Sequence, residues 1–222
     1  MIFCNLRIDM GKSIFVTGID TDAGKTYATA WMLQQYASKG VRVISQKFIQ
    51  TGNVGHSEDI DAHRRLCGTG LLPEDEQGLT APVIYSFPAS AQLAARIDGD
   101  RPIPLERIDA ARAELERRYD IVLVEGAGGL MVPITDDFMA IDYARTRNLP
   151  VALVTNSKLG SINHTVLSLE AVAARGMTLH CVLYNTFLDA KDALIAEDTR
   201  AFVARYVERH FPGTPIYDIP VM

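Results

Sequence analysis

The feature that most constrains the fold is a glycine-rich segment that separates an apolar run from a helical pattern. The apolar run is Ser13–Thr17, and the segment Gly18–Thr26 (GIDTDAGKT) follows it and opens a helix predicted over Lys25–Ser38. In that setting the backbone N–H groups of the loop and of the helix N-terminus can bind phosphate. The lysine can contact the β- and γ-phosphate oxygens, and the next hydroxyl can join a Mg²⁺ shell. The segment therefore predicts a phosphate-binding loop, or P-loop, in which Lys25 and Thr26 take these last two roles.

The glycine spacing departs from the standard P-loop pattern by one position. The glycine expected at Ile19 stands instead at Gly18, so the loop is a variant. A glycine-rich turn that binds no nucleotide is the alternative interpretation. The order of strand, loop, Gly-Lys-Thr and helix favours phosphate binding.

The rest of the chain alternates apolar runs with helical patterns. Further apolar runs lie at Val41–Gln46, Ile121–Val124, Val151–Thr155 and Leu179–Leu183. Near-continuous apolar strands are typical of a parallel sheet that is covered by helices on both faces. We therefore predict an α/β protein with the three-layer P-loop NTPase fold, in which a mostly parallel central sheet is flanked by helices and ligands bind at the carboxyl ends of the strands. Besides the first helix, helices are predicted at Asp59–Cys67, Ser90–Ile97, Leu105–Arg118, Phe138–Arg147, Ile162–Arg175 and Asp192–His210, with a loop at 68–82.

Length and composition bound the class of protein. The 222 residues, 48% of them hydrophobic, suit a single domain over residues 1–222. The formal net charge of −5 argues against a nucleic-acid partner, and no apolar run reaches the roughly 20 residues needed to cross a bilayer. The three cysteines lack the spacing of a zinc site or a disulfide framework, so we expect a cytoplasmic protein that binds no membrane. Residues 1–10 are a candidate disordered extension, and Met1 and Met10 are both candidate start sites.

A candidate metal ligand directly follows the apolar run Ile121–Val124. Glu125 begins the glycine-rich turn Glu125–Gly129 (EGAGG). Mg²⁺ prefers hard oxygen ligands and usually keeps several waters, so a carboxylate at the end of a neighbouring strand can reach it directly or through water. Alone, such a turn is more often a plain transition from strand to loop. Together with the P-loop, it predicts part of a nucleotide site.

Four segments occur in the order found in dethiobiotin synthetases. They are Gly18–Thr26, Lys47–Gly52 (KFIQTG), Glu125–Gly129 and Lys158–His164 (KLGSINH), and the chain resembles that family over nearly its whole length. The resemblance implies that the chain converts 7,8-diaminononanoate, CO₂ (or bicarbonate) and MgATP to dethiobiotin, ADP and phosphate in biotin biosynthesis. In such enzymes a substrate amine forms a carbamate, and the carbamate takes the γ-phosphoryl group. The second amine then closes the ring on the carbamic-phosphoric anhydride.

The resemblance also implies roles for particular residues. Phosphoryl transfer to a carbamate brings anions together, so cations must neutralise the oxygens where charge gathers. Lys25 and Lys47 suit that role, with Thr21 as a hydroxyl donor beside them. The expected nucleotide-binding residues are Asp22, Ala23, Gly24, Lys25, Thr26, Tyr27, Glu125, Gly128, Asn185 and Pro220. The expected substrate-binding residues are Thr51, Gly129, Leu159, Gly160, Ser161, Ile162 and Asn163.

For the metal, the resemblance implies an aspartate just after the lysine segment. Asp59 and Asp61 are both candidates, and we prefer Asp59, so that Thr26, Asp59 and Glu125 form the Mg²⁺ set. Acidic residues also occur at helix N-termini because the helix dipole favours negative charge there, which is the alternative explanation for Asp59 and Asp61.

The segment Leu159–Asn163 begins a helix after a buried strand, and its free N–H groups can bind a carboxylate. In the resembling enzymes this segment comes from the partner subunit and binds the tail carboxylate of the substrate. The resemblance therefore implies a homodimer with active sites at the interface. A plain helix cap is the alternative. The five histidines show no pairing pattern, so we assign none of them a catalytic role.

Two other classes of protein are alternatives. An amidoligase that activates a carboxylate usually needs a glutaminase domain or partner, for which this chain has no room. A nucleotide switch of the partition-ATPase type normally carries an additional lysine early in its loop, where this chain has Ile19 and Asp20. The chain ends near Pro220, where members of the resembling family often continue with a segment over the base, so the sequence leaves the nucleotide selectivity open.

Overall fold

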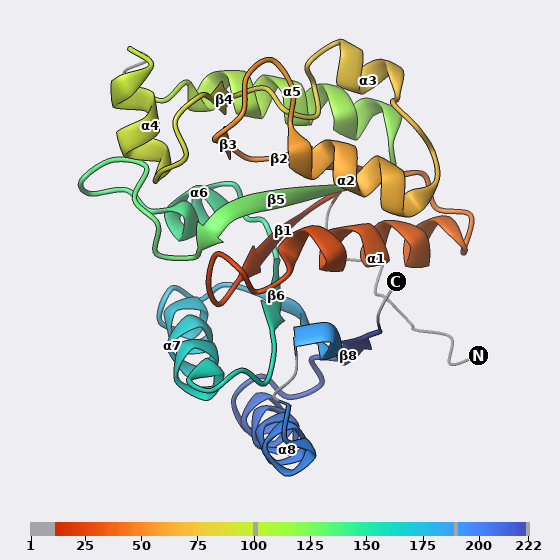
Figure 1. Ribbon diagram of the computed structural model, residues 1–222, viewed down its shortest axis with the longest axis vertical. Helices are drawn as coiled ribbons and strands as arrows, with labels where there is room; N and C mark the ends of the chain where they lie inside the picture. Colours follow the sequence, from red (N-terminus) through yellow and green to blue (C-terminus); the bar gives the residue numbers. More distant parts are fainter. Residues whose placement is uncertain (1–11, 100–101, 189–190, 221–222) are drawn as a thin grey trace.

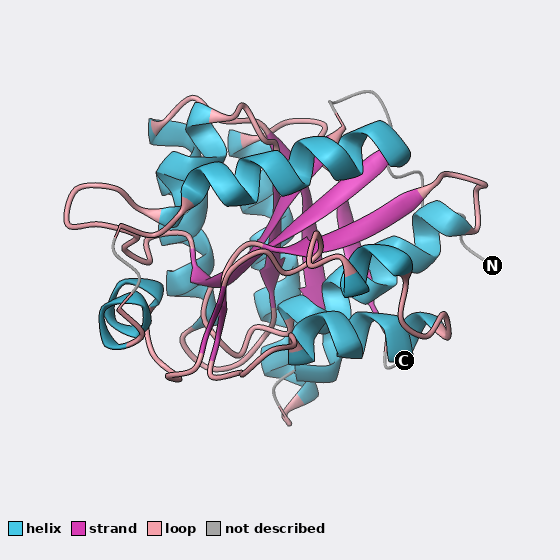
Figure 2. Cartoon of the chain, turned by 90° about the horizontal axis from the view of Figure 1, so that it is seen from above, coloured by secondary structure: helices cyan, strands magenta, loops and turns pink. Residues whose placement is uncertain are grey.

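The structure is a computed structural model that describes residues 12–99, 102–188 and 191–220. Its centre is a six-stranded sheet in the order β2-β5-β1-β6-β7-β8, in which every neighbouring pair of strands is parallel. Helices cover both faces of this sheet, as Figures 1 and 2 show. The predicted three-layer α/β fold is therefore confirmed. The extension predicted over residues 1–10 lies outside the described residues.

All of the predicted strands are present, and three short ones were not predicted. The strands are β1 (Ser13–Gly18), β2 (Val43–Lys47), β3 (Gln50–Thr51), β4 (Ile84–Tyr85), β5 (Ile121–Gly129), β6 (Val151–Thr155), β7 (Leu179–Asn185) and β8 (Ile216–Ile219). The unpredicted β3 and β4 form a small parallel ladder beside the main sheet. The unpredicted β8 forms the edge of the main sheet next to β7.

All of the predicted helices are present, with ends close to the predicted ones. The helices are α1 (Lys25–Ala37), α2 (Glu58–Cys67), α3 (Pro73–Glu76), α4 (Ala91–Ile97), α5 (Leu105–Arg118), α6 (Ala140–Thr146), α7 (Ser161–Ala174) and α8 (Ala193–His210), with the 3₁₀ helix η1 (Thr186–Leu188). The prediction of a continuous loop at 68–82 is wrong in part, because α3 lies within it. Proline is favoured at the first position of a helix, and the Asp75 carboxylate accepts a hydrogen bond from the Leu72 N–H at 2.8 Å, which caps this short turn. Of the helices that the structure describes, none has the length and apolar character needed to span a bilayer.

The sheet separates two hydrophobic cores. Successive side chains of a strand point to opposite faces, so Phe15 and Val16 of β1 belong to different cores. Val16 packs with Met32 and the other buried side chains of α1. Phe15 packs on the opposite face with Tyr143 of α6 and with side chains of α5 and α7. Both faces of β1 are therefore buried, which explains its continuous apolar sequence.

The carboxyl ends of β1, β2 and β5 meet at one edge of the sheet. Lys47, the last residue of β2, is paired with Glu125 of β5, and Glu125 is paired with Val16 of β1. The loop between β1 and α1 ends at Gly24, whose φ is 89° and where a Cβ atom would lie 2.0 Å from the Asn185 Nδ2. Only glycine fits such a position. The register of the sheet thus brings the P-loop, Lys47 and Glu125 to the same edge.

Candidate active site

A cavity of about 850 Å³ lies at this edge of the sheet. Its walls come from the P-loop, the end of β2 and the segment after it, α2, β5 and the segment that follows β7. The predicted site residues that line it are Thr21, Asp22, Gly24, Lys25, Thr26, Tyr27, Lys47, Thr51, Asp59, Glu125, Gly128 and Asn185. Most of the predicted residues therefore surround one space.

Lys25 begins α1, and its ammonium group is folded back on the P-loop. Its Nζ donates hydrogen bonds to the carbonyl oxygens of Asp20 at 2.9 Å and of Thr21 at 2.8 Å. Burial lowers the pKa of Lys25 to about 8, although the Glu125 carboxylate opposes this shift. A buried ammonium with a lowered pKa would be stabilised by an anion such as a phosphate group.

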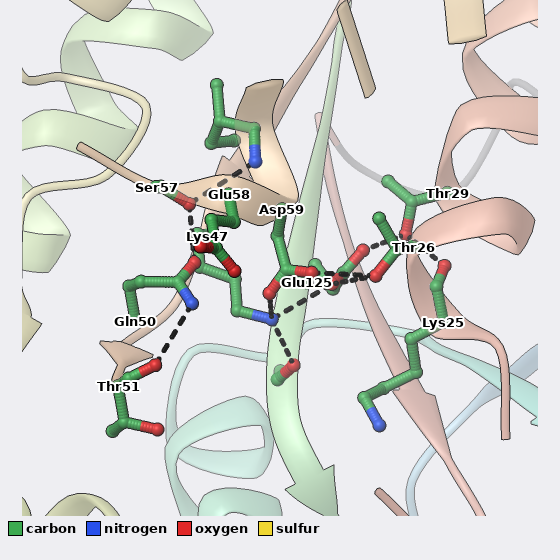
Figure 3. A network of polar contacts seen from close by, with 12 residues as sticks. Lys25, Thr26, Thr29, Lys47, Gln50, Thr51, Ser57, Glu58, Asp59 and Glu125 are labelled. Atoms are coloured by element: carbon green, nitrogen blue, oxygen red, sulfur yellow. Dashed lines mark hydrogen bonds and ion pairs between the residues drawn. The ribbon is translucent and has the colours of Figure 1, made fainter. Parts of the chain in front are cut away.

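Lys47 lies between two carboxylates (Figure 3). Its Nζ is 2.5 Å from the Asp59 Oδ2 and 2.9 Å from the Glu125 Oε1, and it donates to the Gly126 carbonyl at 3.2 Å. Burial lowers the pKa of the Lys47 ammonium, but the neighbouring Glu125 and Asp59 carboxylates outweigh burial, so the pKa lies above its usual value. Lys47 is therefore a fixed cation at the end of β2.

Glu125 is fully buried, and its two oxygens face different groups. Its Oε1 is near Lys47 and lies 3.5 Å from the Thr26 Oγ1. Its Oε2 accepts a hydrogen bond from the Thr29 Oγ1 at 2.6 Å and lies 2.9 Å from the His63 Nε2. Burial raises the pKa of the Glu125 carboxyl, but the Lys47 and His63 side chains lower it by more, so it lies well below its usual range. Glu125 is therefore ionised at neutral pH.

The residues predicted to hold Mg²⁺ converge at one wall of the cavity. The Thr26 Oγ1 donates to the Asp59 Oδ1 at 2.8 Å and lies near Glu125. The Lys47 ammonium lies between the Asp59 and Glu125 carboxylates, so these two groups can surround a cation. Among the described residues, no group of three or more His, Cys, Asp or Glu side chains could hold a metal ion. A Mg²⁺ ion here would take its other oxygens from nucleotide and water, as Mg²⁺ usually does. This chemistry fits the residues present.

Of the two candidate aspartates, the geometry favours Asp59. The Asp61 side chain lines the cavity, but its Oδ2 lies 3.8 Å from the His56 Nε2 at the surface. Asp59, by contrast, contacts both Thr26 and Lys47. The two residues lie on different sides of α2, because they are two positions apart in a helix.

The segment after β7 forms another wall of the cavity. Asn185 is buried, and its Nδ2 donates to the Ala23 carbonyl at 3.3 Å while its Oδ1 accepts from the Phe187 N–H at 3.2 Å. The rings of Tyr27 and Phe187 stack with their centroids 6.2 Å apart. A nucleotide base can stack on such aromatic rings. The sequence prediction included Asn185 and omitted the aromatic ring of Phe187, two residues further on.

The remaining predicted residues do not line this cavity. Ala23 is buried in the core beneath the P-loop, and Gly129 borders a smaller hollow beside α7. Pro220 is exposed and follows β8. The segment Leu159–Asn163 lies at the start of α7, where Leu159 is 96% exposed. Ser161 is buried, and its Oγ has no hydrogen-bond partner among the described residues.

Residues that were not predicted support the site from behind. Ser57 caps α2 by accepting a hydrogen bond from the Ile60 N–H at 3.2 Å, and its hydroxyl donates to the Gln50 Oε1 at 2.5 Å. This contact ties the start of α2 to the segment that follows β2 (Figure 3). His63 was given no role, although it contacts Glu125. The available signal was its spacing of four residues from Asp59, which places both side chains on one face of α2.

These features define a nucleotide-binding protein with the P-loop NTPase fold. Solved structures with this fold include chloroplast FtsY from Physcomitrella patens (TM-score 0.55, 13% identity, 99% of this chain and 63% of that chain). Others are a chain of the MinC:MinD cell division complex of Aquifex aeolicus (0.54, 15%, 95% and 82%) and a ParA family ATPase from Chlorobium tepidum (0.51, 16%, 94% and 84%). At these identities the likeness shows the fold alone.

Sequence relatives define the family more narrowly. A family model described as an AAA domain matches residues 12–220. An ATP-dependent dethiobiotin synthetase of Pasteurella multocida is 44% identical over 92% of this chain and 95% of its own length, and one of Haemophilus ducreyi is 45% identical over 92% and 96%. A third, from Chlorobaculum tepidum, is 42% identical over 99% and 91%. The chain belongs to the family of ATP-dependent dethiobiotin synthetases, so the resemblance found in the sequence is confirmed.

Proposed function

We propose that this chain catalyses the ATP-dependent carboxylation and ring closure of 7,8-diaminononanoate to dethiobiotin, the activity expected of its family. The observation that carries this proposal is the presence of two buried ammonium groups, those of Lys25 and Lys47, at the wall of one cavity. A nucleotide switch needs cations for its nucleotide only. Transfer of a phosphoryl group to a carbamate also needs a cation beside the acceptor, because a second anion approaches the γ-phosphate.

The proposed reaction balances without an additional reagent. One amine of the substrate adds to CO₂ and loses a proton, which gives a carbamate. A carbamate oxygen attacks the γ-phosphorus, the bond from that phosphorus to the bridging oxygen breaks, and ADP leaves. The second amine then attacks the carbamic carbon and loses a proton, and inorganic phosphate leaves as the carbon–oxygen bond breaks. The product is the cyclic urea of dethiobiotin.

The chain's own residues supply charge and position in this proposal. Lys25 binds the β- and γ-phosphate oxygens, and Lys47 stabilises the carbamate and the phosphoryl group in transfer, with the Thr21 hydroxyl as a further donor. Thr26, Asp59 and Glu125 would hold Mg²⁺, which when bound neutralises charge on the phosphate oxygens. The short distances among these side chains support the assignment.

The residues that line the cavity also support separate binding regions for the phosphates and for the base of the nucleotide. Asp22, Gly24 and Gly128 lie beside the phosphates in this proposal. Tyr27 and Asn185 lie beside the base, together with Phe187, which was not among the predicted residues. Ala23 contributes its backbone from beneath the loop. Pro220, which is exposed after β8, has the weakest geometric support.

We further propose a homodimer whose active sites use residues from both subunits. In this arrangement Thr51 and Gly129 bind the substrate from one chain. The partner's copy of residues 159–163 binds the tail carboxylate at the N-terminus of α7. The buried Ser161 Oγ that lacks a hydrogen-bond partner supports this role, as a hydroxyl donor for an incoming anion. The exposed apolar side chains of Met131, Leu159 and Leu167 support an interface on this side of the molecule.

The partners of the proposed enzyme are small molecules: 7,8-diaminononanoate, CO₂ or bicarbonate, and ATP. Neither nucleic acid nor membrane takes part in the reaction. These metabolites meet in the cytoplasm, where we place the enzyme.

The test is phosphate release from the purified protein with MgATP and bicarbonate, with and without 7,8-diaminononanoate, while dethiobiotin is followed by mass spectrometry. We expect one phosphate for each dethiobiotin, both dependent on the diamine. Phosphate release that is indifferent to the diamine, without product, would overturn the proposal and favour the nucleotide switch.

A further inference from the structure

We infer that His63 is a positioning residue that fixes the Glu125 carboxylate and so leaves only one of its oxygens for the metal side of the cavity. This inference rests on the proposed metal set of Thr26, Asp59 and Glu125. His63 does not line the cavity, and its imidazole is fully buried. Its role would therefore be exerted through Glu125 and not through contact with substrate.

The two oxygens of Glu125 have separate environments. The Oε1 faces the cavity, 2.9 Å from the Lys47 Nζ and 3.5 Å from the Thr26 Oγ1. The Oε2 is held on the other side by the Thr29 Oγ1 at 2.6 Å and the His63 Nε2 at 2.9 Å. With both of these donors in place the carboxylate cannot rotate about its last bond without losing a buried hydrogen bond. One oxygen is thereby presented to the cavity and the other is withheld.

The imidazole of His63 is itself held in place from behind. Its Nδ1 lies 3.0 Å from the Ser45 Oγ, and the Arg64 Nη1 donates to the same Ser45 oxygen at 3.1 Å. Because the Glu125 Oε2 can only accept, the His63 Nε2 carries the hydrogen. Because Ser45 accepts from Arg64, its own hydrogen is available for the His63 Nδ1. Every buried polar atom of this chain of contacts therefore has a partner.

The outer end of the chain of contacts is anchored on α3. The Arg64 guanidinium donates to both oxygens of Asp75 at 2.9 Å. Asp75 also accepts from the Leu72 N–H at 2.8 Å and from the Thr80 hydroxyl at 2.7 Å. This polar connection therefore runs from a capped turn, through Arg64, Ser45 and His63, to the carboxylate at the active site.

The position of His63 on α2 connects the two carboxylates of the proposed metal set. Asp59 and His63 are four residues apart, so they project from the same face of the helix. Asp59 reaches the cavity directly, where it contacts Thr26 and Lys47. His63 reaches Glu125 one turn later. A single helix thus sets the position of Asp59 and the orientation of Glu125.

A histidine that merely fills the core and satisfies its own polar atoms would also be buried and hydrogen-bonded. The two roles differ in what a substitution changes. Loss of a purely structural histidine lowers the stability of the protein and leaves the metal affinity of the folded fraction unchanged. Loss of a positioning residue weakens metal binding itself, by about 10- to 100-fold in sites where the outer partners of ligands have been removed.

The experiment measures Mn²⁺ binding to the folded protein in the presence of ADP, by electron paramagnetic resonance of the free ion. We expect His63→Leu, which removes the donor with little change in volume, to weaken Mn²⁺ binding by about tenfold or more. His63→Gln can place a side-chain N–H near the position of the His63 Nε2, and we expect it to recover most of the affinity. The apparent KM for Mg²⁺ should rise in His63→Leu by a similar factor, with a smaller change in kcat at saturating Mg²⁺.

Two control variants make the result specific. His180 is a second buried histidine, with its Nε2 3.2 Å from the Tyr36 Oη near the far end of α1, and His180→Leu should reduce the melting temperature without weakening Mn²⁺ binding. Asp59→Ala should abolish Mn²⁺ binding, so that the free-ion signal rises to that of a sample without protein, which confirms that the measurement reports on this site. If His63→Leu does not fold, Ser45→Ala removes only the support behind the imidazole and should weaken Mn²⁺ binding in the same direction.

Unchanged Mn²⁺ affinity in folded His63→Leu, or in Ser45→Ala where that variant is needed, would overturn the inference. Wild-type affinity in Asp59→Ala would overturn it as well. Failure of the proposed function gives a different result, because the wild-type protein would then bind Mn²⁺ and ADP and form no dethiobiotin.

Discussion

At the scale of single residues, the two active-site lysines differ in what balances their charge. Lys25 is bonded to neutral carbonyl groups, and burial lowers its pKa to about 8. Lys47 is bonded to Asp59 and Glu125, which raise its pKa above the usual value. Lys25 is thus bonded to uncharged oxygen atoms, whereas Lys47 contacts two carboxylates. This contrast predicts different consequences for the loss of each side chain.

We expect Lys47→Ala to reduce kcat by about 10²- to 10³-fold, the usual effect of removing one electrostatic donor to a transition state. Binding of an ATP analogue should remain close to that of the wild type, because the P-loop and Lys25 are intact. Turnover and calorimetric titration measure the two effects separately. Lys25→Ala is the matched comparison and should damage both binding and turnover. Wild-type turnover in Lys47→Ala would exclude the role proposed for this lysine.

The lowered pKa of Lys25 predicts a pH dependence of ATP binding. Phosphate oxygens favour the charged ammonium, but above about pH 8 the unliganded side chain is mostly neutral and must take up a proton when ATP binds. The affinity for ATP should therefore be constant well below pH 8, begin to fall near pH 8 and then approach a loss of about tenfold per pH unit. Lys25→Arg remains charged throughout this range. Its affinity should not fall in the same window, and an identical decline in both proteins would assign the effect to another group.

At the scale of secondary-structure elements, the long buried strands and the amphipathic helices could be predicted from sequence, because each repeats its pattern over several residues. β6 was predicted with its observed ends, since Val151–Thr155 is buried throughout. β3, β4 and β8 could not be predicted, because two to four residues are too few to show a period. They form because neighbouring strands offer partners, which is a property of the tertiary structure.

Prediction of the candidate site from sequence has the same limit. The P-loop and Glu125 could be predicted from the residues, because each follows an apolar run at a defined position. Lys47 and Asp59 depended on resemblance, since a lysine after a strand and an aspartate at a helix start are common on protein surfaces. His63 and Phe187 were not predicted, because their contacts with Glu125 and Tyr27 form only when α2 packs beside β2 and η1 lies beside α1. Contacts of this kind have no local sequence pattern.

At the scale of the whole molecule, the start of α7 lies outside the cavity of its own chain. The P-loop, Lys47 and Glu125 all line it, but the start of α7 does not. In Figure 1 α7 lies on the opposite side of β1 from α2, which provides Asp59. Exposed Leu159 and the buried Ser161 hydroxyl near the start of this helix are therefore better suited to a neighbouring subunit than to their own cavity.

The proposed division of the site between subunits predicts complementation between two inactive variants. Lys47→Ala damages the phosphoryl-transfer part of a site, and Ser161→Ala combined with Leu159→Asp damages the part that a subunit provides to its partner. Each variant alone should have little activity. After unfolding and refolding as an equal mixture, half of the dimers are mixed, and each mixed dimer has one site with both parts intact. The mixture should therefore recover about a quarter of wild-type activity.

The measurement is dethiobiotin formation by the refolded mixture, with the oligomeric state checked by light scattering. Mixing the two variants without unfolding is the control, and it should show no recovery while the dimers stay assembled. Recovery in the refolded sample would require that residues from two chains meet at one site, because neither chain has a complete set. A mixture that contains dimers of both chains and has no more activity than its components would place the start of α7 outside the site. The substrate tail would then have to bind within a single subunit.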